Sequence, residues 1–252
     1  MSRSSIDLNA DVGEGFATDA ELIPLVSSAN IACGAHAGDE KAMREAVTFA
    51  MRHGVAIGAH PGFEDRENFG RREMPIAPEA AAKLVVEQVR RLQVIAESLG
   101  AELRHVKLHG ALYNMACRDR ALATAIAKAV MELSLRLSGP SVVYALGGSP
   151  FIGIGREMDL RMVGEAFADR SYQDDGTLMP RSKAGAVLAA AQAASQALQI
   201  AREGSVFAAS GAKIMLNAET ICLHGDSADA VACARRIADG LRAAGISISR
   251  PA

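Results

Sequence analysis

Four of the six histidines follow short apolar runs, and they are His36, His60, His109 and His224. Imidazole changes its charge near neutral pH, so it is well suited to give or take a proton in a reaction. A single histidine in such a place is more often structural than catalytic. Four of them in equivalent places, flanked by glycines that permit close approach of a ligand, predict an acid–base site.

Carboxylates, an amide and two cationic side chains occupy the same kind of place. They are Asn9 and Asp11 in DLNADVGE, Lys107 in VKLHGALYN, Glu165, Asp169 and Arg170 in GEAFADRSY, and Asp226 in CLHGD. Carboxylates and imidazoles supply general acids and bases, and a cation stabilises an oxyanion. The combination predicts one shared site for hydrolytic chemistry.

Lys107 lies inside an apolar run, where an isolated charge is costly to bury. It either pairs structurally with a carboxylate such as Asp7, Asp11 or Glu165, or it belongs to the site, which is the interpretation we favour. The pair Arg71–Arg72 follows the third apolar run. It either grips an anion or is a solvated loop pair.

Short apolar strands that alternate with longer helices must position these groups. Strands are expected at Ser5–Asn9, Ala29–Cys33, Val55–Ala59, Val106–Leu108, Ser141–Leu146, Arg161–Glu165, Ile221–Leu223 and Ile246–Ile248. Helices are expected from a capping box at Thr18–Glu21 and at Asp39–Arg52, Glu79–Leu99, Arg120–Leu137, Pro150–Met158, Ser182–Glu203 and Ser227–Ala244. The stretch 205–217 is ambiguous.

This alternation predicts a parallel sheet with right-handed crossovers. A chain of 252 residues has a normal length for one (β/α) barrel, and no linker or change of composition divides it. We therefore expect an α/β fold, with residues 1–252 forming one domain, a variant TIM-like barrel of seven or eight strands. Catalytic groups of such barrels gather at the C-terminal ends of the strands, where the βα loops emerge.

Composition excludes several classes of protein. The formal net charge of −2 provides no basic excess for nucleic acid or a membrane surface. The four cysteines form no CxxC pair, which argues against a disulfide framework or a thiolate zinc site. With no signal-peptide pattern and no apolar run of membrane-spanning length, we expect a cytoplasmic protein. A homo-oligomer is left open.

Common nucleotide-binding signatures are missing from the sequence, since there is no GxxxxGK[ST] phosphate loop and no GxGxxG after a strand. The GxSxG motif of a serine nucleophile is missing too. The chain therefore has no evident means of holding ATP or NAD by itself.

The segments that carry these residues resemble the LamB/YcsF family almost from end to end. They are DLNADVGEGF, SSANIACGAHAGD, IGAHPGFEDRENFGRR, VKLHGALYN, EAFADRSYQDDGTLMPRS and ICLHGD. Two departures are mild: Ala35 stands where the family often has Phe, and Leu108 where it often has Pro. Both alter the shape of a pocket without removing a polar group.

The resemblance implies a variant barrel similar to that of metal-dependent polysaccharide deacetylases. It also implies an activity: one component of an ATP-dependent 5-oxoprolinase, which opens 5-oxo-L-proline (pyroglutamate) to L-glutamate with partner subunits B and C. The partners would then supply nucleotide activation, consistent with the missing phosphate loop.

On that hypothesis the candidate residues divide into two groups. The catalytic group is Asp11, His36 and His60, for water activation or substrate orientation, Lys107 and His109, for charge stabilisation or proton donation, and Glu165. The substrate-binding group is Asn9, Asp169, Arg170, His224 and Asp226, with Arg170 a candidate for the substrate carboxylate.

Three questions stay open at this point. Histidine and aspartate at these loops could bind zinc or another divalent ion. A stand-alone metal-dependent deacetylase or amidohydrolase would hold stoichiometric metal and hydrolyse without ATP. A non-catalytic component that binds a small carboxylate would keep the complex's turnover when His109 or Asp11 is replaced.

Overall fold

The computed structural model describes residues 4–137, 139–226 and 229–251. Within them, seven parallel strands pair in the order β1-β2-β3-β4-β5-β6-β9, and β9 pairs again with β1, which closes a barrel. The strands are β1 (Ser5–Val12), β2 (Ser28–Ala32), β3 (Ala56–His60), β4 (His105–Lys107), β5 (Val142–Leu146), β6 (Arg161–Phe167) and β9 (Thr220–His224). The predicted α/β barrel is confirmed, with seven strands in its ring.

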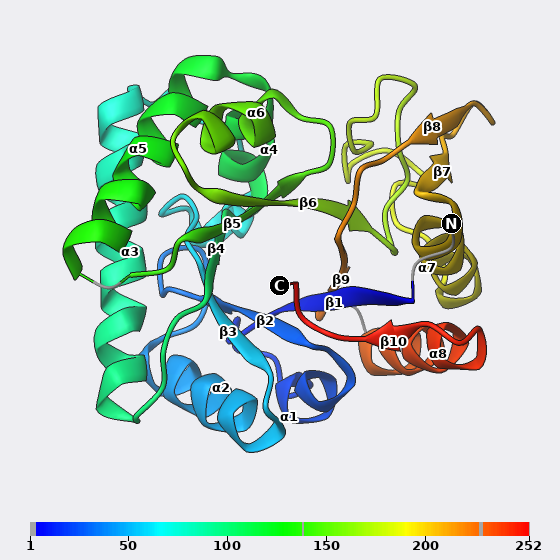
Figure 1. Ribbon diagram of the computed structural model, residues 1–252, viewed down its shortest axis with the longest axis horizontal. Helices are drawn as coiled ribbons and strands as arrows, with labels where there is room; N and C mark the ends of the chain where they lie inside the picture. The colour runs from blue at the N-terminus through cyan, green and yellow to red at the C-terminus, as the bar shows by residue number, and fades with distance from the viewer. Residues whose placement is uncertain (1–3, 138, 227–228, 252) are drawn as a thin grey trace.

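Helices surround the strands, as Figure 1 shows. They are α1 (Asp19–Leu22), α2 (Glu40–His53), α3 (Pro78–Ser98), α4 (Gly110–Arg118), α5 (Arg120–Leu137), α6 (Pro150–Glu157), α7 (Ala190–Glu203) and α8 (Ala230–Ala243), with 3-10 turns η1 (Ile23–Leu25) and η2 (Arg66–Asn68). On α3 the buried residues Val85, Val89 and Leu92 recur at helical spacing. The main apolar core lies between these helix faces and the outer faces of the strands.

Helix α2 shows how the sequence sets the ends of an element. The Oδ1 atom of Asp39 accepts a hydrogen bond from the backbone N–H of Ala42 at 2.8 Å, which caps the first turn. Gly54 ends the helix with a φ of 66°, a conformation that glycine adopts without strain. The loop from β2 to this cap carries His36.

Two expectations for the helices were wrong, and one helix was missed. Helix α7 begins at Ala190, because residues 186–188 bond back to the β6 loop: Ser171 N–H donates to Ala186 O, and Leu188 N–H to Asp169 O. The capping box does not form, because the Thr18 hydroxyl donates to Gly225 O instead. Helix α4 was not anticipated. The expected start of the last helix at Ser227 lies outside the described residues.

The ambiguous stretch 205–217 forms an antiparallel hairpin of β7 (Ser205–Phe207) and β8 (Lys213–Met215). It lies beside α7 at the right of Figure 1. The last predicted strand is β10 (Ser247–Ile248), which pairs with the first residues of β1 and is not part of the closed ring. Within the described residues, no helix has both the length and the apolar character needed to cross a membrane.

The interior of the barrel is polar where its strands begin. Asp7 is 1% exposed, and it accepts hydrogen bonds from Ser28, Tyr144 and Thr220, at 2.8, 3.1 and 2.6 Å. Ser27 also donates to it, at 2.6 Å. Barrels of this class more commonly fill the interior with layers of branched apolar residues. The polar interior here continues into the site above it.

Substitution of Gly164 by Ala is expected to destabilise the fold by about 1–3 kcal/mol, the usual cost of overpacking. A Cβ at this position on β6 would overlap the backbone oxygen of Asn217, so the backbone must move. Gly153→Ala on α6 is the matched control, since nothing lies within 4 Å of its added Cβ and alanine favours the helix. Urea unfolding of both variants measures the difference, and equal stabilities would contradict the expectation.

Candidate functional site

Asp11 lies at the centre of the residues that the sequence singled out. It is at the C-terminal end of β1, 3% exposed, and it contacts side chains from the ends of three other strands. The Nζ of Lys107 lies 2.7 Å from its Oδ1, the Nε2 of His60 3.2 Å from its Oδ2, and the Nε2 of His224 3.9 Å from its Oδ2. The predicted gathering of these groups in one place is confirmed.

Lys107 answers the question that the sequence left open, because it both pairs and lies in the site. Its Nζ is 2.7 Å from Asp11 Oδ1 and 3.2 Å from Glu165 Oε1, and the side chain is 2% exposed. Burial alone would lower the pKa of Lys107, but the charge of Asp11 and the other neighbouring acidic groups together outweigh it and hold that pKa well above its usual value. Burial would likewise raise the pKa of Asp11, yet His60 and Lys107 hold it well below the usual value. The site therefore contains a buried ammonium–carboxylate pair.

The side-chain amides of Asn9 and Asn30 support the Lys107–Asp11 pair inside the barrel. Asn9 donates to Glu165 Oε1 at 3.0 Å and to Thr220 Oγ1 at 2.7 Å. Asn30 donates to Asn9 Oδ1 at 2.7 Å and to Asp11 Oδ1 at 2.8 Å. Asn9 is fully buried, and both ends of its amide are bonded within the protein. The structure therefore places Asn9 as a buried support of Glu165, and its expected role in substrate binding stays a prediction.

His105 belongs to this layer although it comes before the end of its strand. Its Nε2 lies 2.7 Å from Asn30 Oδ1, and its ring stacks on Tyr144 with centroids 4.2 Å apart. A Cβ on Gly58 would collide with this ring, so the glycine on β3 makes room for it. Burial, followed by the charge of Lys107, lowers the pKa of His105 to about 3.

Replacing His105 by Gln is expected to weaken the acid sensitivity of the fold. The folded pKa of about 3 lies below the unfolded value of about 6.5, so above pH 6.5 the protonation of His105 does not lower the free energy of unfolding. As pH falls below 6.5 the unfolded chain gains a proton that the folded chain lacks, which costs about 1.4 kcal/mol per pH unit. Urea unfolding at pH 7 and 4.5 should therefore show about 2–3 kcal/mol less acid destabilisation in the variant. The exposed His53→Gln is the control, and equal pH dependence in all three proteins would contradict the assignment.

Three histidines and Glu14 form a second cluster beside Asp11. The rings of His36 and His109 stack with centroids 3.7 Å apart, and His109 Nδ1 lies 2.9 Å from His60 Nε2. Glu14 Oε1 is 3.3 Å from His36 Nε2 and 3.7 Å from His109 Nδ1. Gly70, at a φ of 63°, lies so close to both stacked rings that a Cβ there would not fit. Glycine is therefore required for the rings to stack.

Burial governs the charges in this cluster. It lowers the pKa of His36 to about 2, with the charge of His60 as the next cause. Burial also lowers the pKa of His109 well below its usual value. Burial raises the pKa of Glu14 well above its usual value, and the charge of Asp11 raises it further. Four donor atoms, from Glu14, His36, His60 and His109, lie within 4.8 Å of one another and could hold a metal ion. A second set, from Asp11, Cys222 and His224, has the same spread.

His224 and Asp169 form a pair at the more open side of the site. His224 Nδ1 lies 2.9 Å from Asp169 Oδ2, and the His224 side chain is 11% exposed. Burial alone would raise the pKa of Asp169, but the charge of His224, the hydrogen bonds from His224 and the charge of Arg181 together outweigh it and lower that pKa. A carboxylate on Nδ1 fixes the tautomer and leaves Nε2 facing the site, which is the arrangement of a general base.

Charged side chains surround Asp226 at the rim. Arg71 lies 2.6 Å and Arg181 3.3 Å from Asp226 Oδ2, with 30% and 25% of their side chains exposed. Arg170 is different, because its Nε donates to Ala186 O at 3.2 Å and a terminal nitrogen to Met179 O at 2.6 Å. Arg170 therefore braces the loop after β6, and the anion-binding role expected of it fits Arg71 and Arg181 better.

Sequence reasoning missed several residues of the site. They are Glu14, Asn30, Thr220 and Cys222, together with Arg181, which the sequence places only at the end of a loop. The signal for Asn30 and Thr220 was their position on an apolar run, where a polar residue needs a partner. For Glu14 it was proximity to Asp11 in DLNADVGE.

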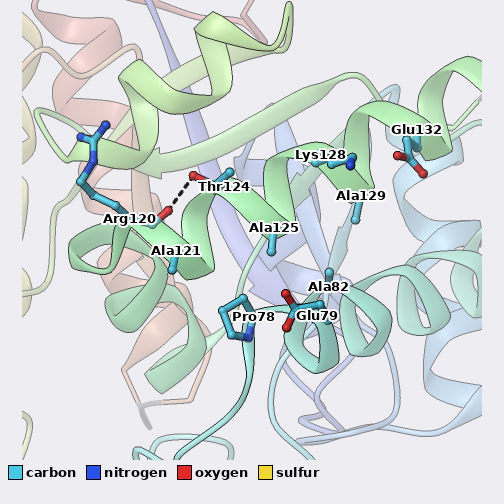
Figure 2. A pocket seen from close by; sticks show the side chains of 10 residues that line it. All are labelled: Pro78, Glu79, Ala82, Arg120, Ala121, Thr124, Ala125, Lys128, Ala129 and Glu132. Carbon is cyan, nitrogen blue, oxygen red and sulfur yellow. Dashed lines mark hydrogen bonds between the residues drawn. The ribbon is translucent and has the colours of Figure 1, made fainter.

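A surface groove of about 660 Å³ lies elsewhere, between α3 and α5. Figure 2 shows that Glu79 and Ala82 of α3 face Ala125 and Ala129 of α5 across it. Its other lining residues are Pro78, Arg120, Ala121, Thr124, Lys128 and Glu132. None of the catalytic or substrate-binding candidates lines it.

Comparison with known proteins shows which sequences and folds this chain is similar to. A family model described as LamB/YcsF matches residues 6–252. The 5-oxoprolinase A subunit of Shouchella clausii (strain KSM-K16) is 46% identical over 251 residues, which is 97% of this chain and 98% of the relative. The crystal structure of a lactam utilization protein from Thermus thermophilus superposes with a TM-score of 0.87 at 41% identity, covering 97% of this chain and 99% of that one. A family 4 carbohydrate esterase from Streptomyces lividans shares the fold at a TM-score of 0.51 and 11% identity, over 100% of this chain and 95% of that one.

Proposed function

The chain belongs to the LamB/YcsF family, and from this membership we propose that it is the A subunit of an ATP-dependent 5-oxoprolinase. It opens 5-oxo-L-proline to L-glutamate together with partner subunits B and C. The observation that carries the proposal is the 46% identity, over nearly the whole of both chains, to a 5-oxoprolinase A subunit. The buried acid–base site at the strand ends supports it independently.

The reaction needs ATP because a five-membered lactam is an unreactive amide that must first be activated. Transfer of a phosphoryl group from ATP to the lactam oxygen makes the carbonyl carbon electrophilic. We assign that transfer to the partner subunits, since this sequence has no phosphate loop. Water then adds to the carbon and the ring nitrogen leaves it with a proton, which gives γ-glutamyl phosphate. A second water hydrolyses this acyl phosphate to L-glutamate and phosphate.

In this scheme His224 is the general base. Asp169 holds its Nδ1, so its Nε2 is free to take the proton of the attacking water. Asp11, 3.9 Å from that Nε2, stabilises the imidazolium that results. The Nε2 of His60 lies 3.2 Å from the same carboxylate.

Lys107 and the rim arginines supply positive charge for the same scheme. Lys107 is fixed by Asp11 and Glu165, and its ammonium stabilises the oxyanion that forms when water adds. Arg71 and Arg181 take the α-carboxylate of the substrate, for which Asp226 is the protein's own carboxylate partner. If a metal ion occupies the Glu14–His36–His60–His109 cluster, it supplies Lewis-acid polarisation of an oxygen.

The direct test is glutamate release from 5-oxo-L-proline, with and without ATP, by this chain alone and with its B and C partners. Release only with ATP and all three subunits is the expected result. No release from the full, folded complex would reject this substrate. Release by the chain alone without ATP would instead favour a stand-alone amidohydrolase.

A further inference from the structure

Two histidines of the second cluster have their tautomers fixed by backbone carbonyls. The Nδ1 of His60 lies 2.8 Å from Lys107 O, and the Nε2 of His109 lies 2.9 Å from Phe69 O. A carbonyl oxygen only accepts, so each of these nitrogens must carry the hydrogen. In the neutral rings, the other two nitrogens, His60 Nε2 and His109 Nδ1, are therefore lone-pair atoms.

Those two lone-pair atoms face each other at 2.9 Å. Two acceptors at this distance repel unless a proton or a cation lies between or beside them. Histidines that bind metals show this same pattern, with the far N–H donated to a backbone carbonyl or a carboxylate, which aims the near nitrogen at the ion. Both rings are held in that way here.

The remaining donors complete a four-atom set of suitable size. Glu14 Oε1 lies 3.3 Å from His36 Nε2 and 3.7 Å from His109 Nδ1, beside the 2.9 Å pair. Ligands about 2.0–2.1 Å from a tetrahedral Zn²⁺ lie about 3.3 Å apart, which is close to these separations. The stacked rings of His36 and His109 are nearly parallel, so they must rotate before both nitrogens point at one ion. The Nδ1 of His36 has no hydrogen-bond partner among the described residues. No protein contact at Nδ1 therefore fixes which nitrogen of that ring carries the hydrogen.

We propose that Glu14, His36, His60 and His109 bind one divalent transition-metal ion of the zinc type. Three imidazoles and one carboxylate match the donor preference of zinc and its neighbours and do not match Mg²⁺ or Ca²⁺. Glu14 contributes one negative charge, and Asp11, 3.2 Å from His60 Nε2, contributes a second beside the site. The glycines at 62 and 70 lie close against the stacked rings, so the cluster is tightly packed.

The test uses the full chain without a histidine tag, stripped with a chelator and titrated with Zn²⁺ against a competing chromophoric chelator. We expect about one tightly bound ion per chain and a rise in melting temperature that saturates with it. His36→Gln and Glu14→Gln should each weaken binding at least tenfold and reduce the rise. The exposed His53→Gln should leave both unchanged.

Two results would overturn the assignment. Binding to the wild-type chain no tighter than to a folded His36→Gln/His109→Gln variant would reject the site. Loss of binding in His224→Gln, with retention in His36→Gln, would move the ion to the Asp11, Cys222 and His224 set. Because the assay contains neither substrate nor partner subunits, its outcome is separate from that of the 5-oxoprolinase proposal.

Discussion

Replacing His224 by Gln is expected to lower kcat for ATP-dependent glutamate release by at least about a hundredfold, the scale of one acid–base group. The imidazole lies where Asp169 fixes its tautomer and Asp11 stabilises its charged form, at 2.9 and 3.9 Å. Glutamine fills a similar volume but cannot take a proton at neutral pH. Steady-state kinetics of the reconstituted complex measure the loss.

Asp169→Asn is the companion variant for this prediction. The amide can present its N–H to Nδ1 and so favour the other tautomer, which places the hydrogen on Nε2 and removes the base. We expect a loss of kcat of similar size, with a melting temperature close to wild type. The exposed Asp239→Asn on α8 is the control. Wild-type turnover in a folded His224→Gln complex would exclude the proposed role.

Replacing Lys107 by Met is expected to lower the free energy of unfolding by about 3–5 kcal/mol, the cost of leaving a buried partner charge uncompensated. Methionine has a similar shape, so the loss reports charge and not volume. The ammonium is the partner of two carboxylates, Asp11 at 2.7 Å and Glu165 at 3.2 Å, and all three side chains are buried. Urea unfolding at pH 7 measures it.

The pH dependence separates this explanation from simple packing damage. Without the ammonium, burial of Asp11 is no longer offset by the charge of Lys107, so the folded pKa of Asp11 rises and its protonation stabilises the variant as pH falls. The difference between wild type and variant should therefore shrink from pH 8 to pH 5. Lys213→Met is the matched control, because Lys213 also lies 2.8 Å from a carboxylate, Glu203, but at the surface. A pH-independent difference would indicate lost packing instead.

The sequence allowed the barrel and much of the site to be predicted, because both depend on local order. Alternating strands and helices determine a parallel barrel, and a parallel barrel places every strand's C-terminal end on one face. His60 and Lys107 could therefore be placed together although 47 positions separate them. The side chains that His60 and Lys107 contact could not be predicted from the order of strands and helices.

Contacts across the barrel depend on register, which a single sequence does not reveal. Asn30 reaches Asp11 because those two residues are paired in the ladder between β1 and β2. His105 precedes the apolar part of its strand and so gives no signal of a site, yet register with Gly58 places its ring inside the barrel. The position of Arg170 depends on the conformation of its loop, because its guanidinium donates hydrogen bonds to backbone carbonyls of that loop.

The closure of β1 against β9 determines when the site can exist during synthesis. Thr220 donates to Asp7 across 213 positions of the chain, and β1 pairs along Asp7–Asp11 with β9. On the ribosome, the first strand emerges long before its second neighbour, and one edge of it stays unpaired until about nine-tenths of the chain has been made. Because β1 and β9 lie far apart in the sequence, we expect closure of the barrel to be a slow and late step of folding. A nascent chain truncated before β9 should therefore bind chaperones and lack any catalytic capacity, since Asp11 would have no His224 beside it.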